Sequence, residues 1–88
     1  MGIDAEGMLL FLIVDGAELR DRGMTITELG DAFVDLGAVY ALNLDGGGST
    51  TAWVNGEGFI DRPTCTDYIF PECARDVASA ICVMPALV

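Results

Sequence analysis

A run of three glycines between an acid and two hydroxyl residues is the segment of this sequence best suited to bind a ligand. Its residues are Asp45, Gly46, Gly47, Gly48, Ser49 and Thr50. Glycines let the backbone take positive φ and let a ligand approach without meeting a Cβ atom, and successive amides can converge on an anion. The segment could therefore hold a phosphate or a sugar beside an acid. Judged by residue spacing alone, a tight turn that only connects two elements is a simpler interpretation than a ligand-binding loop.

The glycine segment lacks the companion residues of common nucleotide and metal motifs. A P-loop needs a lysine and a following helix, and a dinucleotide fingerprint needs a second set of glycines. The chain contains no lysine and no histidine, and its three cysteines have no zinc-binding spacing. The alternating oxygen ligands of a calcium-binding hand are absent as well. We therefore expect neither a metal ion nor an organic cofactor.

Arg75 is the cation best placed to contact a phosphate. It is one of only four arginines and lies two residues after a cysteine, in front of the last apolar stretch. A disulfide-closed loop could fix its guanidinium, which binds phosphate oxygens through two parallel hydrogen bonds. An ion pair with Glu72 or Asp76 explains the residue equally well at this point. The role of Arg62 is undecided.

The three cysteines leave one thiol unpaired after any single disulfide. Cys65 and Cys73 flank residues 66–72 and could close them into a loop, which would indicate an oxidising compartment. Cys82 lies in the apolar stretch 80–84, where a buried free thiol is common.

The composition argues against some classes of binding partner. The chain has 88 residues, enough for one small domain, and its formal net charge is -10. This charge argues against sequence-independent binding to nucleic acid or to an anionic membrane surface. The longest apolar run, Met8 to Val14, is far shorter than the roughly 20 residues that cross a bilayer, and no basic region precedes it as in a signal peptide.

One helix and several strands must position these residues. Thr25 and Glu28 match a capping box, which predicts a helix over about 26–36 that ends at Gly37. Its apolar residues recur at helical spacing and should pack on the core; they are Ile26, Leu29, Phe33 and Leu36.

The strands are predicted from apolar runs and turn residues. They are the end of a strand near Gly2 with a turn at Asp4–Gly7, a strand over Met8–Val14 buried on both faces, a strand over Ala38–Leu44, a hairpin around Asn55-Gly56, and a final strand over Val77–Met84. We expect an α+β fold with a mixed β-sheet and the order β-β-α-β-β-β. Because the first arm is so short, its pairing partners are expected to be missing from this chain.

In this order, the segments resemble the C-terminal part of a phosphodiester glycosidase domain. The similarity runs from about Gly2 to Val83, and its motifs are a short helix, Leu42-Asn-Leu-Asp-Gly-Gly-Gly-Ser-Thr50, Trp53-Val-Asn-Gly56, Arg62-Pro63, a cysteine-bounded loop and Arg75-Asp-Val77. The resemblance implies that residues 1–88 are the C-terminal part of such a domain, that its upstream part is missing, and that the chain alone is inactive. Cys82 matches a family cysteine whose partner lies upstream, so its thiol and the sheet edges should be exposed.

The resemblance also implies a function. The family hydrolyses N-acetylglucosamine-1-phosphodiester linkages and uncovers mannose 6-phosphate on lysosomal hydrolases, in the Golgi or outside the cell. By this resemblance, Asp45 acts in catalysis or orients the sugar, and Arg75 binds the phosphate. The remaining loop residues would bind substrate: Gly46, Gly47, Gly48, Ser49 and Thr50. The alternative is a non-catalytic module that binds carbohydrate or phosphate.

Overall fold

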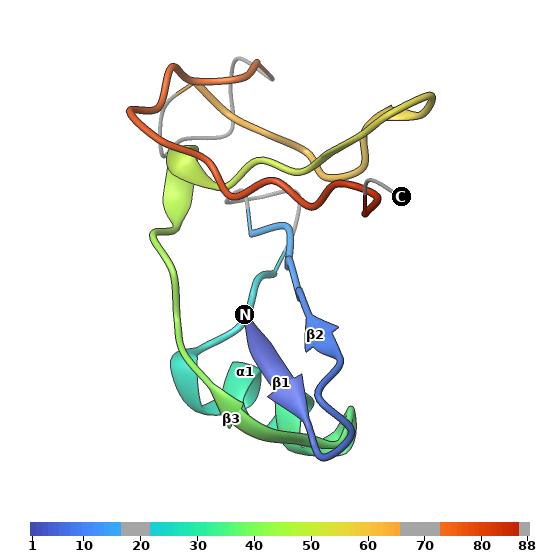
Figure 1. Cartoon of the computed structure of the whole chain (residues 1–88). Coiled ribbons are helices and arrows are strands. Elements are labelled where there is room, and N and C mark those ends of the chain that lie inside the picture. The colour runs from blue at the N-terminus through green and yellow to red at the C-terminus, as the bar shows by residue number, and fades with distance from the viewer. Residues whose placement is uncertain (17–21, 66–72, 87–88) are drawn as a thin grey trace.

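The computed structural model describes residues 1–16, 22–65 and 73–86 of the chain. Its elements are β1 (Gly2–Asp4), β2 (Leu9–Leu10), α1 (Ile26–Asp35), β3 (Ala38–Ala41), the 3₁₀ turn η1 (Gly47–Ser49), β4 (Trp53–Val54) and β5 (Gly58–Phe59). α1 and the strands β1 to β3 gather at one end of the molecule, and η1, the β4–β5 hairpin and the last described residues lie at the other (Figure 1). The α+β class is confirmed.

β1 is the central strand of a three-stranded antiparallel sheet of order β2-β1-β3. Gly2 pairs with Leu10 on one side and with Ala41 on the other. The expectation that this short arm lacks partners was therefore wrong, because three residues suffice to bond to strands on both sides. The predicted turn after it is confirmed: Asp4 Oδ1 accepts the amides of Glu6 and Met8, at 2.9 and 2.8 Å.

α1 begins and ends where the capping residues predict. The Thr25 hydroxyl accepts the Glu28 amide at 3.2 Å, and Glu28 Oε2 accepts the Thr25 amide at 3.4 Å. Gly37 follows the helix with φ +86°, and its amide donates to the carbonyl oxygen of Val34 at 2.9 Å. These bonds satisfy backbone groups that a helix end leaves unpaired.

The core is the contact between α1 and the sheet. Phe33 is 4% exposed and is the one buried large apolar residue of the described chain. Its ring lies against Gly2 of β1, where a Cβ atom would come within 3.0 Å of Phe33 Cδ1. The rest of the predicted apolar stripe is less buried, since Ile26 and Leu36 are exposed.

The predicted hairpin forms a second, separate sheet. β4 pairs antiparallel with β5, and Trp53 lies opposite Phe59. The turn between them contains Gly56 at φ +85°, as the Asn55-Gly56 pair predicts. Every strand pair of the described residues is antiparallel, so the expected mixed sheet is corrected to two small antiparallel sheets. Hairpin turns make two of the three pairs, and such short connections cannot join parallel strands.

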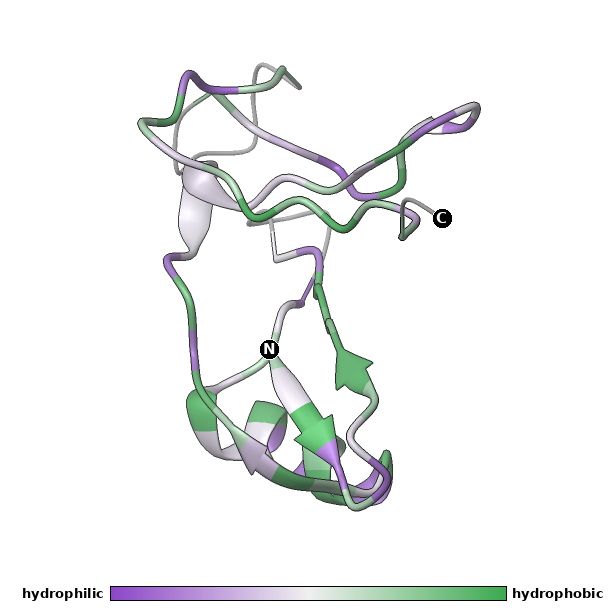
Figure 2. Ribbon diagram, in the orientation of Figure 1, coloured by the Kyte–Doolittle hydropathy of each residue, from purple (hydrophilic) through white to green (hydrophobic). Residues whose placement is uncertain are grey.

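Two apolar segments do not form the strands that their composition predicts. Only Leu9–Leu10 of the run Met8–Val14 is a strand, and Met8 and Phe11 are exposed rather than buried on both faces. Val77–Met84 forms no strand in the described chain, and Met84 is 79% exposed. Figure 2 shows hydrophobic residues along β2 and along the last described segment. The first prediction is confirmed only at Leu9–Leu10 and was wrong about burial on both faces, and the second was wrong. A buried strand needs a covering layer on each face, which the described residues do not supply here.

The chain is more extended than a compact domain of its length. Its accessible surface is 6941 Å², against about 5,000 Å² for a compact monomer of this size. Its radius of gyration is 14.1 Å, against about 12 Å. Among the described residues, no helix has the length and apolar character needed to span a membrane.

Candidate functional site

The glycine segment forms a tight turn. Gly47 takes φ +58°, which favours glycine, and opens the 3₁₀ turn η1. The amides of Ser49 and Thr50 donate inside the turn, to the carbonyl oxygens of Gly46 and Gly47 at 3.2 and 3.0 Å. These two amides are therefore committed to the turn, and a ligand must use the amides that precede them.

Arg75 lies on one side of this turn. Its Nη2 atom donates to Ser49 Oγ at 2.5 Å, across 26 residues of sequence. Gly48 is buried beneath the guanidinium, and a Cβ atom at Gly48 would lie 2.9 Å from Arg75 Nη1. The structure thus brings Arg75, Gly48 and Ser49 together, as expected for residues of one site.

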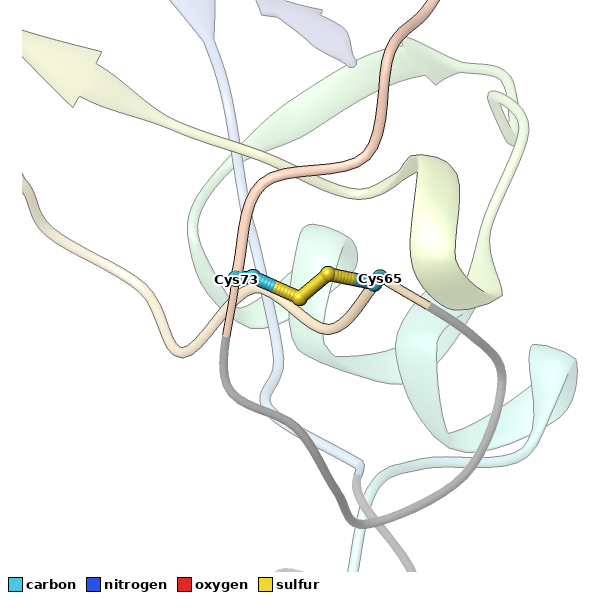
Figure 3. Close-up of a disulfide and its surroundings, with 2 residues drawn as sticks. All are labelled: Cys65 and Cys73. Carbon is cyan, nitrogen blue, oxygen red and sulfur yellow. A yellow bond between two sulfur atoms is a disulfide. The ribbon is translucent and has the colours of Figure 1, made fainter.

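A disulfide holds the segment that carries Arg75. Cys65 and Cys73 are bonded, with their Cα atoms 5.1 Å apart, as the sequence predicts (Figure 3). The Cys73 amide donates to the carbonyl oxygen of Pro63 at 3.1 Å. Thr64, just before the disulfide, is buried, and its carbonyl oxygen lies 3.0 Å from where a Gly48 Cβ would be. The disulfide therefore ties together the two segments, at Thr64 and at Arg75, that contact the turn at Gly48.

The other predicted site residues are less closely gathered. Asp45 is exposed and precedes the 3₁₀ turn η1. Thr50 is half-buried and lines a pocket that Ser49 does not line. Cys82 is a free, exposed thiol, so the burial expected from its apolar surroundings was wrong and the exposure implied by the family resemblance is confirmed.

The pocket lies next to the glycine turn and has a volume of about 140 Å³. Gly47 and Thr50 supply the wall from the turn. The remaining lining residues are Val14, Asp15, Gly16, Asp61, Arg62 and Thr64. The pocket thus combines two carboxylates, a guanidinium residue and hydroxyls next to the turn.

Asp15 and Asp61 are residues that the sequence did not single out as part of a site. Asp15 Oδ1 accepts the Arg62 amide at 2.8 Å, across 47 residues, and Asp61 Oδ1 accepts the Ala52 amide at 3.0 Å. Both side chains are half-buried. Each acid directly follows an apolar run, a position that also suits an ordinary turn residue, so only the fold shows that they share a pocket with Arg62.

Comparisons with known proteins show the family of the chain. The sequence profile of the phosphodiester glycosidase family matches residues 1–84. The chain is 36% identical over 85 residues to the N-acetylglucosamine-1-phosphodiester alpha-N-acetylglucosaminidase of Bos taurus and 34% identical over 85 residues to that of Homo sapiens. Each alignment covers 94% of this chain and 16% of the relative.

A bacterial relative also matches. The chain is 37% identical over 57 residues to the SPbeta prophage-derived uncharacterized protein YomE of Bacillus subtilis (strain 168). This alignment covers 65% of the chain and 9% of the relative. No solved structure matches the chain significantly. The chain therefore spans only a small part of the length of its curated relatives.

Proposed function

The chain belongs to the phosphodiester glycosidase family, and on that premise we propose that it supplies part of a site that hydrolyses N-acetylglucosamine-1-phosphodiester linkages. The observation that carries this proposal is the 2.5 Å bond from Arg75 Nη2 to Ser49 Oγ above Gly48. A guanidinium beside a hydroxyl is suited to hold the phosphate of such a substrate.

The reaction depends more on hydrogen-bond donors that bind the phosphate than on a strong general acid. Cleavage on the sugar side of the phosphate releases a phosphate monoester, whose second pKa is about 6, so it leaves without the full protonation that an ordinary glycoside requires. In this scheme Arg75 and Ser49 bind the phosphate, with help from the amide of Gly46. Asp45, at the mouth of the loop, acts in catalysis or orients the sugar.

The substrate and compartment follow from the same premise. We propose that the complete protein uncovers mannose 6-phosphate on glycans, including those of lysosomal hydrolases. It would do so in the secretory pathway, in the Golgi or outside the cell. The Cys65–Cys73 disulfide supports an oxidising compartment.

We further propose that residues 1–88 act as the C-terminal part of a larger domain, whose remainder covers the exposed apolar residues of β2 and of Val77–Met84. The chain by itself would then have little or no hydrolytic activity. Large apolar patches on a protein surface commonly mark an interface, and the relatives are much longer than this chain.

A chimera tests the function directly. In it, this chain replaces the matching 85-residue segment of the Bos taurus relative. The chimera should release N-acetylglucosamine from a phosphodiester substrate, and Asp45→Asn should lower kcat by about 10²-fold or more, the usual contribution of a positioned acid or base. Asp35→Asn, which removes an exposed helix carboxylate, is the matched control and should leave kcat unchanged.

Two outcomes would count against the proposal. A folded chimera that does not hydrolyse the substrate would contradict the proposed activity. Unchanged kinetics of Asp45→Asn would show that Asp45 has no role in the mechanism. Measurable hydrolysis by the 88-residue chain alone would contradict its role as an incomplete part.

The second candidate function is a non-catalytic module that binds carbohydrate or phosphate. The observation that favours it is the exposure of Asp45, while Arg75 and Ser49 are already paired. A binding module should hold mannose 6-phosphate without any further sequence. Calorimetric titration of the 88-residue chain with mannose 6-phosphate separates the two candidates, because an incomplete enzyme should bind it much more weakly than the chimera does.

A further inference from the structure

We propose that the pocket lined by Asp15, Asp61 and Thr50 binds the sugar ring of the substrate, next to the phosphate held by Arg75. This inference rests on the proposed function and deepens it. It assigns the two parts of a glycosyl phosphodiester to different residues of one turn: Gly48 and Ser49 lie against Arg75, whereas Gly47 and Thr50 line the pocket.

The carboxylates of the pocket are held in place and still have acceptor capacity. Asp15 Oδ1 and Asp61 Oδ1 each accept one backbone amide, from Arg62 and from Ala52. An ionised carboxylate offers about four lone-pair sites, so each side chain can accept hydroxyl protons from a ligand as well. Acceptors fixed by the backbone in this way are suited to hydroxyl groups of a sugar, because they lose little freedom on binding.

Charge separates the two parts of the substrate. Two carboxylates repel a phosphate at close range, so an anionic group is directed away from Asp15 and Asp61 toward Arg75. A neutral, hydroxyl-rich group suits the pocket instead. A volume of about 140 Å³ has room for several water molecules, which sugar hydroxyls can replace.

A metal ion is a weaker match to these residues. Arg62 also lines the pocket and adds a positive charge there. Within residues 1–16, 22–65 and 73–86, no group of three or more histidine, cysteine or acidic side chains gathers as metal ligands. The side chains at the pocket therefore favour a neutral polyol over a divalent cation.

The test is a pair of NMR titrations of the ¹⁵N-labelled 88-residue chain, one with N-acetylglucosamine and one with inorganic phosphate. N-acetylglucosamine should shift the amide signals of Gly16 and Gly47, which line the pocket. Phosphate should shift those of Gly48 and Ser49 instead. Shifts by the sugar at Ser49 alone, or at neither Gly16 nor Gly47, would overturn the inference.

Isosteric variants then test the carboxylates. Asp15→Asn and Asp61→Asn keep an oxygen for the backbone amide but remove the charge. Each should weaken sugar binding about tenfold, as expected when a charge-assisted hydrogen bond is lost, and should leave phosphate binding unchanged or tighter. Asp31→Asn removes the same charge from the exposed face of α1 and should change neither affinity.

A third variant keeps the test informative if the two aspartate variants misfold. Thr50→Val removes the pocket hydroxyl without removing a charge or the hydrogen bonds from backbone amides to Asp15 and Asp61, and should also weaken sugar binding with phosphate binding intact. Unchanged sugar affinity in all three variants would overturn the pocket assignment. The proposed function fails separately, through a folded chimera that does not hydrolyse the phosphodiester, so the two results can be told apart.

Discussion

Gly48 shows at the scale of one residue why this segment needs glycine. Its neighbours are the flexible end of Arg75, at 2.9 Å from an added Cβ, and the backbone oxygen of Thr64, at 3.0 Å. The side chain of Arg75 could move, but the backbone carbonyl could not without shifting the chain before the disulfide. The lack of a side chain at Gly48 therefore sets how closely Arg75 approaches the turn.

Gly48→Ala should lower the free energy of unfolding by about 1–3 kcal/mol, the usual cost of forcing extra atoms into a packed contact. It should also weaken binding of inorganic phosphate, because Arg75 would be displaced from Ser49. Urea unfolding and a phosphate titration measure the two effects. Gly30→Ala is the matched control, since an added Cβ there meets no atom within 4 Å and Gly30 lies in α1, outside the glycine segment. Equal effects of the two substitutions would show that the contact with Arg75 does not matter.

At the scale of the element, the disulfide loop positions what the glycine turn needs. Thr64 precedes Cys65 and Arg75 follows Cys73, and both lie against the position that a Cβ atom of Gly48 would take. The two arms of the loop thus both contact the turn at Gly48. The hydrogen bond from the Cys73 amide to Pro63 holds the same two arms together.

Reduction of the disulfide should therefore loosen both arms. Loop closure over a sequence separation of 8 residues accounts for about 2.5 kcal/mol of stabilisation in the chain-entropy description. The Cys65→Ser/Cys73→Ser double variant should unfold at lower urea concentration and should bind inorganic phosphate more weakly. Cys82→Ser, which removes the free exposed thiol, should change neither. If phosphate affinity survives loss of the disulfide, the loop does not position Arg75.

At the scale of the whole molecule, the chain has little interior. Phe33 is buried, yet many large apolar residues of β2, β4 and Val77–Met84 are exposed. The total surface exceeds that of a compact monomer, as described above. Stability in the isolated chain is therefore concentrated at the contact of Phe33 with Gly2.

Phe33→Ala should abolish the cooperative unfolding transition, because a buried Phe→Ala substitution costs about 3–5 kcal/mol and the chain has little other core. Val34→Ala removes an adjacent helix residue that is 70% exposed and is the matched control, with a change of at most about 0.5 kcal/mol. Thermal melting followed by circular dichroism measures both. A Phe33→Ala variant that melts like the wild type would show that the stability lies elsewhere in the chain.

The sequence by itself determined the parts of this protein that depend on local chemistry. The Thr25–Glu28 capping box, the Asn55-Gly56 hairpin turn and the eight-residue separation of Cys65 and Cys73 each act within a few residues, so their patterns were sufficient. The association of Arg75 with the glycine segment was predicted through the family resemblance, and the structure brings the two together. The roles of Asp45 and of the substrate-binding residues stay predictions.

Only the tertiary structure decided which distant segments meet. The strands predicted at Met8–Val14 and Val77–Met84 have apolar composition, but composition measures the tendency to be buried and does not supply the neighbouring layer that buries a strand. Asp15 and Asp61 look like ordinary turn acids in the sequence. They share a pocket because the Arg62 amide bonds to Asp15 across 47 residues, a pairing set by the path of the whole chain rather than by any local pattern.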